Sequence, residues 1–220
     1  MSAGRERELK LRLPSREAFV RLRDGPGWGT RSAPERQVSH YFDTVGHALA
    51  LSRALVRIRE GASRVLTFKH GEEQLPGFFD SVEIEAEVGE DVLAAALRDP
   101  ESLLDVPTAP VAELRKRFGR PPLGWTGRLE NERVRRSIEP GRATPAGTGP
   151  LILEIDRVVF PDGIEEHELE VELGEGDDPR AVQAWVLESL RAQGIAAEPE
   201  RLTKLERLLR RTADRGGAAP

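Results

Sequence analysis

Two glutamates and a lysine near the start of the chain are spaced so that they could hold a metal ion beside an anion. Glu6, Glu8 and Lys10 stand at every second position, and leucines alternate with them over residues 9–13. Side chains on a β-strand point to opposite faces with a period of two, so the pattern predicts one apolar and one charged face. Carboxylate oxygens suit Mg²⁺ or Mn²⁺, and ammonium groups hold phosphate oxygens. This chemistry requires other strands with matching faces.

Further segments show the alternation of a strand with one charged face. They are residues 37–42, 54–59, 64–69, 81–88, 128–138, 151–159 and 166–173. With the opening strand they make eight, a number that suits a closed barrel of modest bore. Helical patterns occupy the intervals between them, at residues 16–23, 91–98, 109–118, 179–193 and 201–211. We expect one domain over residues 1–212, an exposed loop at 141–150 and a flexible tail at 213–220.

The charged faces decide what such a barrel could do. A single charged strand face is usually solvated surface. If helices cover the apolar outside of a barrel, however, the charged faces turn inward, and buried charges must pair, bind metal or bind a charged ligand. The acidic residues on these faces are Glu6, Glu8, Glu83, Glu85, Glu87, Glu154, Asp156, Glu168, Glu170 and Glu172. The basic residues are Lys10, Arg12, Arg57, Arg59, Lys69, Arg133 and Arg135. The predicted fold class is α+β, an eight-stranded antiparallel β-barrel with a charged interior and helices outside.

Composition narrows the classes of function. The formal net charge is −5, which indicates no general affinity for nucleic acid or acidic membranes. The chain has no cysteine, which excludes disulfides, thiolate metal sites and cysteine nucleophiles. Neither a signal peptide nor a run of transmembrane length is evident. We expect a soluble cytoplasmic protein, a monomer or homodimer, with no nucleic-acid or membrane partner.

An ordered set of motifs resembles the CYTH family, the triphosphate tunnel metalloenzymes. The motifs are Glu6-x-Glu8-x-Lys10, Tyr41-Phe42-Asp43-Thr44, Val56-Arg57-Ile58-Arg59, Thr67-Phe68-Lys69, Glu83-Ile84-Glu85, Glu168-Leu169-Glu170 and Thr203-Lys204. The family includes inorganic triphosphatases, thiamine triphosphatases and class IV adenylate cyclases. The resemblance covers about residues 5–208, and threonine before Lys204 replaces the family's serine.

The resemblance implies a tunnel that binds a triphosphate with Mg²⁺ or Mn²⁺. It implies catalytic roles for Glu6, Glu8 and Lys69. The implied metal ligands are Glu6, Glu8, Asp156, Glu168, Glu170 and Glu172, and which two of the last three match the family pair stays open. Phosphate contacts are expected from Lys10, Arg57, Arg59, Lys69 and Lys204, and from Arg133 or Arg135.

Several activities are compatible with this reading. We expect metal-dependent hydrolysis of inorganic tripolyphosphate to diphosphate and phosphate, by water that attacks a terminal phosphate. Cyclisation of ATP to cyclic AMP, hydrolysis of thiamine triphosphate, and a non-catalytic polyphosphate- or nucleotide-binding module are alternatives. Aromatic residues make up only 5% of the chain, which favours a substrate without a base. Trp28, Trp125 and Trp185 are expected to pack, as is Tyr41, and the four histidines show no spacing typical of a zinc site.

Overall fold

The computed structural model describes residues 2–139 and 149–216 of the chain. Most of the expected loop at 141–150 therefore lies outside the described residues. The same holds for residues 217–220, at the end of the expected tail.

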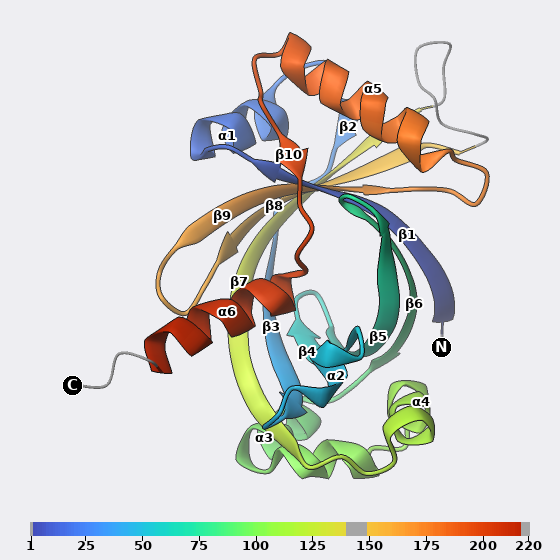
Figure 1. Ribbon diagram of the computed structural model, residues 1–220, viewed down its shortest axis with the longest axis vertical. Helices are drawn as coiled ribbons and strands as arrows, with labels where there is room; N and C mark the ends of the chain where they lie inside the picture. The colour runs from blue at the N-terminus through green and yellow to red at the C-terminus, as the bar shows by residue number, and fades with distance from the viewer. Residues whose placement is uncertain (1, 140–148, 217–220) are drawn as a thin grey trace.

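Eight long antiparallel strands of the described chain close into a barrel (Figure 1). They are β1 (Ser2–Leu13), β3 (Glu35–Thr44), β4 (Ala54–Glu60), β5 (Arg64–Leu75), β6 (Phe78–Glu87), β7 (Leu123–Ile138), β8 (Leu151–Val159) and β9 (Glu165–Glu172). The order around the barrel is β1-β6-β5-β4-β3-β7-β8-β9, and β9 pairs again with β1. The predicted α+β class and eight-stranded antiparallel barrel are confirmed. Two-residue strands β2 (Thr30–Arg31) and β10 (Glu198–Pro199) pair with the end segments of β7 and β1.

The first strand shows how the two faces are used. Leu9, Leu11 and Leu13 lie on the outer face of β1 and are buried. They join a core that includes residues of α1 (Arg16–Asp24) and α5 (Pro179–Ala192). Figure 1 shows these two helices together at the upper end of the barrel. The apolar faces therefore point outward under helices, and the charged faces of the same strands point into the barrel.

A second core lies on the outer face of β4 and β5. Their apolar side chains Val56, Ile58, Leu66 and Phe68 are buried against three short helical segments. These segments are α3 (Glu90–Arg98), the 3₁₀ helix η1 (Pro100–Asp105) and α4 (Ala109–Phe118). The alternation that predicted the strands is thus satisfied by helical cover on this side as well.

Helix α6 (Lys204–Gly216) packs differently from the others. Leu205 and Leu208 are buried against Tyr41, Leu129 and Val158, three residues on the interior side of β3, β7 and β8. The helix therefore covers part of the barrel interior, where α2 (Ala48–Leu51) also contributes. Tyr41 packs in this cluster, as expected, and it also lines the interior cavity.

Local signals explain where several helices start. The Ser15 hydroxyl accepts a hydrogen bond from the backbone N–H of Ala18 (3.2 Å), which caps α1. The Asp178 carboxylate caps α5 by accepting from the N–H of Arg180 (3.0 Å). Thr203 and Glu206 form a reciprocal capping box at the start of α6, with bonds of 2.8 and 3.2 Å.

Some sequence-based boundaries were wrong. The last helix begins at Lys204 rather than 201, because the capping box starts it there, and it continues to Gly216. Residues 213–216, which were expected in the flexible tail, therefore belong to this helix. Arg12 and Glu87 have inward parity but are exposed, since both lie near the ends of their strands. The sequence also gave no signal for α2, η1, β2 and β10, which are short.

None of the helices in the described ranges is both long enough and apolar enough to cross a membrane.

Substitutions on the two faces of β1 should lower stability by different amounts. Leu11→Ala should lower the free energy of unfolding by about 2–5 kcal/mol, because it opens a cavity beneath α1 and α5. Arg12→Ala, at the adjacent position, removes only an exposed ion pair with Glu198 and should cost less than about 1 kcal/mol. Urea unfolding of both variants measures the difference. Equal losses would contradict the assignment of the faces.

Candidate active site

The barrel encloses a cavity of about 260 Å³ that is lined by charges of both signs. The acidic side chains on its wall include Glu6, Glu8, Glu83, Glu85, Glu154, Glu170 and Glu172. The basic ones include Lys10, Arg57, Arg59, Lys69, Arg133, Arg135 and Lys204. Every predicted phosphate-binding residue therefore reaches the same enclosed space. A metal-bridged polyanion is a ligand that uses both kinds of charge at once.

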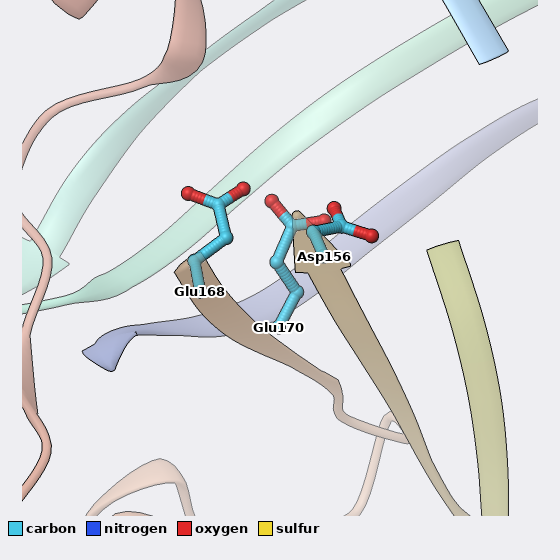
Figure 2. A group of neighbouring side chains, drawn as sticks. All are labelled: Asp156, Glu168 and Glu170. Atoms are coloured by element: carbon cyan, nitrogen blue, oxygen red, sulfur yellow. The ribbon is translucent and has the colours of Figure 1, made fainter. Parts of the chain in front are cut away.

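Three carboxylates form a compact group on β8 and β9. The strand register sets Asp156 opposite Glu168, and Glu170 follows two residues later on the same face. One oxygen from each lies within 4.8 Å of the other two, and all three residues are buried. Figure 2 shows the three side chains gathered on one side of the two strands. Three clustered carboxylates are the oxygen-rich ligand set that hard divalent cations prefer.

A second observation supports a cation at this group. The Glu168 Oε1 atom is buried, and the partner that it contacts is itself a cation, the Lys204 ammonium. A buried carboxylate oxygen that is paired with a cation has the charge and the lone pairs that metal coordination needs. The residues of this group therefore fit Mg²⁺ or Mn²⁺.

Glu172 stands apart from this group. It pairs with Glu8 across β1 and β9, is exposed, and lines the tunnel mouth near Glu6. Partial burial and the negative charge of Glu6 raise the pKa of Glu172 above its usual value. Of the three glutamates left open by the sequence, Glu168 and Glu170 therefore join Asp156, while Glu172 lies at the mouth.

Glu6 and Glu8 share a lysine from the neighbouring wall. The Lys69 Nζ atom donates to Glu8 Oε1 at 2.8 Å and also bonds to Glu6. Glu8 contacts Lys10 as well, at 3.1 Å. Burial lowers the pKa of Lys69, but Glu8 and Glu6 outweigh it and hold the pKa above the usual value. Lys69 therefore stays an ammonium ion, able to bind a phosphate oxygen or either carboxylate.

Arg133 and Arg135 differ in depth. Arg133 is buried and donates to both oxygens of Asp156, at 2.8 and 2.5 Å, and to Glu170 at 2.7 Å. The side chain of Arg135 is 47% exposed and bonds to Glu154 at 2.8 Å. The structure thus separates the two candidates: Arg133 reaches the carboxylate group, and Arg135 lies at the mouth.

Two arginines of β4 lie on the opposite wall. Arg57 donates to Glu83 at 2.9 Å, and Arg59 donates to Glu85 at 3.3 Å. The positive charge of Arg57, followed by burial, lowers the pKa of Arg59. Two guanidinium groups this close repel each other, and an anion placed between them would relieve that repulsion.

Lys204 is the first residue of α6 and reaches the carboxylate group. Its Nζ atom lies 2.9 Å from Asp156 Oδ2 and 3.0 Å from Glu170 Oε1, and it also pairs with Glu168. Burial lowers the pKa of Lys204, but the three carboxylates together raise it above the usual value. A cation at a helix N-terminus is disfavoured by the helix dipole. The carboxylates offset that cost.

Sequence reasoning placed Glu83, Glu85 and Glu154 on charged strand faces but did not assign them to the site, and it missed Arg207. Glu154 bonds to Arg133 and Arg135, and its shared parity with Asp156 was a usable signal. Arg207 is buried and bonds to Glu166 at 2.6 Å and to Glu168. Its three-residue spacing from Lys204 places both side chains on one helix face. That this face meets the carboxylates is evident only once α6 is known to cover the barrel interior. The small number of lysines was a further signal for site residues. The chain has four, and three of them line the cavity.

Histidines and tryptophans lie elsewhere. All four histidines and all three tryptophans belong to the described residues, and none of them lines this cavity. His40 bonds to Glu60 at 3.1 Å, and His167 packs against Phe19. Trp28 packs edge-on against Trp185 and donates to Gln193. The aromatic side chains on the cavity wall are Tyr41 and Phe79.

Comparison with known proteins agrees with this geometry. A family model described as the CYTH domain matches residues 4–201. The chain belongs to the CYTH family. CYTH enzymes bind triphosphate substrates and use divalent metals, and the buried carboxylate group of this chain is suited to such a metal. No curated protein matches the chain.

Solved structures of similar proteins share the CYTH fold. One is HpAC1 from Hippeastrum, a proposed adenylyl cyclase described as having a dominant triphosphatase activity. It is 24% identical, with coverage of 94% of this chain and 96% of that chain and a TM-score of 0.76. A proposed adenylate cyclase from Bacillus halodurans is also 24% identical, with coverage of 93% and 98% and a TM-score of 0.65. The PH1819 protein from Pyrococcus horikoshii is 19% identical, covers 94% and 98%, and has a TM-score of 0.55.

The charge network predicts a pH-dependent contribution from Asp156. Burial opposes ionisation of this carboxyl, but Arg133 and Lys204 lower its pKa to about 2 from 3.8. A lowered folded-state pKa stabilises the protein above the unfolded pKa, and the contribution disappears as pH falls through the folded value. A shift of this size corresponds to about 2 kcal/mol. We therefore expect the stability gap between the natural protein and Asp156→Asn to shrink by about that amount from roughly pH 6 to pH 2.

Urea unfolding at several pH values measures this gap. Glu188→Gln, which changes an exposed carboxylate on α5, is the matched control and should alter stability by less than about 0.5 kcal/mol throughout. A gap for Asp156→Asn that stays constant with pH would show that its ionisation does not stabilise the fold.

Proposed function

We propose that this CYTH protein is a divalent-metal-dependent triphosphatase that hydrolyses inorganic tripolyphosphate to diphosphate and phosphate. The observation that carries the proposal is the composition of the cavity wall. A buried group of three carboxylates, Asp156, Glu168 and Glu170, contacts lysines and arginines that line the enclosed cavity. Tripolyphosphate needs cationic contacts along its whole length, and its hydrolysis needs positioning and charge stabilisation rather than a protein nucleophile.

Asp156, Glu168 and Glu170 are the residues that would hold Mg²⁺ or Mn²⁺. The metal would polarise phosphoryl oxygens and lower the pKa of bound water. Glu6 and Glu8 lie on β1, the strand that pairs with β9, and with Glu172 at the mouth they would hold a second cation or the attacking water. Either role uses the same property, a carboxylate oxygen that accepts from water or coordinates metal.

The basic residues would hold the substrate. Lys10, Lys69 and Lys204 offer point charges, and Arg57, Arg59 and Arg133 offer forked donors for two oxygens at once. Arg135 at the mouth would meet the end of the chain of phosphates. As negative charge builds on the leaving diphosphate, these contacts strengthen, so they stabilise the transition state more than the bound substrate.

The neutral part of the cavity bears on substrate choice. No tryptophan lines it, which supports a substrate without a base. Neutral side chains on β3 and on the adjoining part of β7 form one stretch of the wall: Gln37, Ser39, Tyr41, Leu129 and Asn131. The Asn131 Oδ1 atom is buried without a hydrogen-bond partner, so this wall could contact a ribose or a base. Cyclisation of ATP, or hydrolysis of an organic triphosphate such as thiamine triphosphate, is therefore the second candidate.

A non-catalytic module that only binds polyphosphate or nucleotide is the least supported alternative. Such a module would keep the basic residues and could dispense with the carboxylates, because binding a polyanion needs no metal or activated water. Both sets line this cavity, which favours catalysis.

A substrate panel tests the proposed function. Purified protein with Mg²⁺ or Mn²⁺ is offered tripolyphosphate, ATP and thiamine triphosphate, while phosphate, diphosphate and cyclic AMP are measured. We expect phosphate and diphosphate from tripolyphosphate, with the highest kcat/KM for this substrate, and loss of activity with a chelator. Cyclic AMP as the main product from ATP would overturn the hydrolase assignment in favour of the second candidate.

Substitution of Lys69 tests the role of the cavity charges. Lys69→Met should lower kcat/KM for tripolyphosphate by about 10²- to 10³-fold, because one contact to developing negative charge is worth about 3–4 kcal/mol. Glu8→Gln should cause a loss of similar size. Lys116→Met, which changes an exposed lysine on α4, is the control and should leave kcat/KM within about twofold. Full activity of both Lys69→Met and Glu8→Gln would refute the site.

A further inference from the structure

Lys204 lies at the centre of the carboxylate group that would hold the metal. Its single Nζ atom contacts one oxygen from each member: Asp156 at 2.9 Å, Glu170 at 3.0 Å, and Glu168 as an ion pair. The oxygens of Asp156 and Glu168 that it contacts are in residues of zero exposure. The ammonium group therefore already occupies the position that a divalent cation coordinated by these three residues would take.

An ammonium and a divalent metal cannot share this position. Mg²⁺ needs its oxygen ligands at about 2.0–2.1 Å. An Nζ atom about 3 Å from the same oxygens would then stand within a few ångströms of the metal. Repulsion between a charge of +1 and one of +2 at that separation, in the low dielectric of a protein interior, strongly disfavours occupation by both. One cation must leave before the other binds.

The surrounding contacts allow the lysine to leave while the carboxylates stay in place. Arg207 holds the other oxygen of Glu168, and Arg133 holds both oxygens of Asp156. Leu205 and Leu208 keep α6 packed on the barrel, with 3% and 0% exposure. A change of side-chain rotamer at Lys204 is therefore enough, and the helix need not move.

The destination of the ammonium is also defined. Lys204 lines the cavity on its other side, whereas Asp156 and Glu168 lie buried behind it. Lys204 thus contacts the two fully buried members of the group, Asp156 and Glu168, from the cavity side. Glu170 itself lines the cavity, next to Lys10 and Arg133. A rotation away from the carboxylates moves the charge of Lys204 into the cavity.

We propose that Lys204 and the divalent metal are mutually exclusive occupants of the Asp156–Glu168–Glu170 group, and that metal binding transfers the Lys204 ammonium to the phosphate-binding part of the cavity. The lysine fills the carboxylate group in the metal-free protein and becomes a phosphate contact in the loaded one. Metal binding thereby prepares the cavity for the anion. The phosphate contact rests on the proposed function, but the exchange of cations does not.

Removal of Lys204 should raise the affinity for metal, whereas removal of a residue that supports the metal site would lower it. Lys204→Met should bind Mn²⁺ about tenfold or more tightly without substrate, because no internal cation has to be displaced. Binding is measured by calorimetry, or by the electron paramagnetic resonance signal of free Mn²⁺. Arg211→Met is the matched control, since it removes a cation from the same helix that contacts Glu166 and Asp162 but not Glu168. The control should change Mn²⁺ affinity by less than about threefold.

A measurement on the natural protein makes the test independent of how well the variants fold. The chain has only four lysines, so selectively labelled lysine gives four side-chain signals in a nuclear magnetic resonance spectrum. We expect titration with Mg²⁺ alone to shift the Lys204 signal strongly and to leave that of Lys116 unchanged. The Lys204→Met spectrum, or that of Lys204→Arg, assigns the signal.

Mn²⁺ affinity in Lys204→Met that is equal to or weaker than that of the natural protein would overturn the proposal. So would an equal gain of affinity in Arg211→Met, or a Lys204 signal that Mg²⁺ does not shift. Absence of metal binding in both the natural protein and Lys204→Met would overturn it too. These measurements use no substrate, so a failed hydrolysis assay with a positive exchange result would refute only the proposed function.

Discussion

A carboxylate or ammonium group that moves from water into a closed barrel loses several kcal/mol of hydration, and only a close partner of opposite charge offsets that loss. This barrel encloses many such groups, because its apolar strand faces are covered outside by helices and its charged faces have no other side to occupy. The rest of the structure follows from the need to pair them. Lys10, Lys69, Arg133 and Lys204 each bond to two or more carboxylates.

Such a network supports a fold and a ligand site at the same time. In the metal-free protein the pairs satisfy one another. A metal-bound triphosphate supplies both signs as well, so it can replace internal pairs without leaving a buried charge alone. The cavity walls are therefore preorganised for a ligand of mixed charge, and they penalise a ligand of one sign only. This explains why the carboxylates and the cations are interleaved around the barrel rather than segregated on opposite walls.

The parity of side chains was readable from the sequence, and it accounts for most of what was predicted correctly. Alternation placed Glu8 and Lys10 inside and Leu9 outside, and covering helices at both ends were readable from their caps and apolar spacing. Parity carries no information about depth along the barrel axis. Depth depends on strand stagger, which is set by pairing between strands distant in sequence.

Several misjudged or undecided residues share that cause. Arg133 and Arg135 have the same parity, yet one is buried among carboxylates and the other lies at the mouth. Glu170 and Glu172 differ in the same way. Arg207 was missed for a different reason. The apolar stripe of α6 predicts a packed helix but does not tell that the helix covers the barrel interior.

The central claim is that Asp156, Glu168 and Glu170 form one cation position, held by Lys204 until a metal replaces it. Diffraction from crystals grown with Mn²⁺, recorded at a wavelength where manganese scatters anomalously, tests this most directly. The account predicts an anomalous peak about 2.1 Å from an oxygen of each carboxylate, with the Lys204 ammonium turned toward the cavity. A Lys204 ammonium that remains among the three carboxylates, with manganese bound only at the mouth near Glu6 and Glu172 or nowhere, would contradict it.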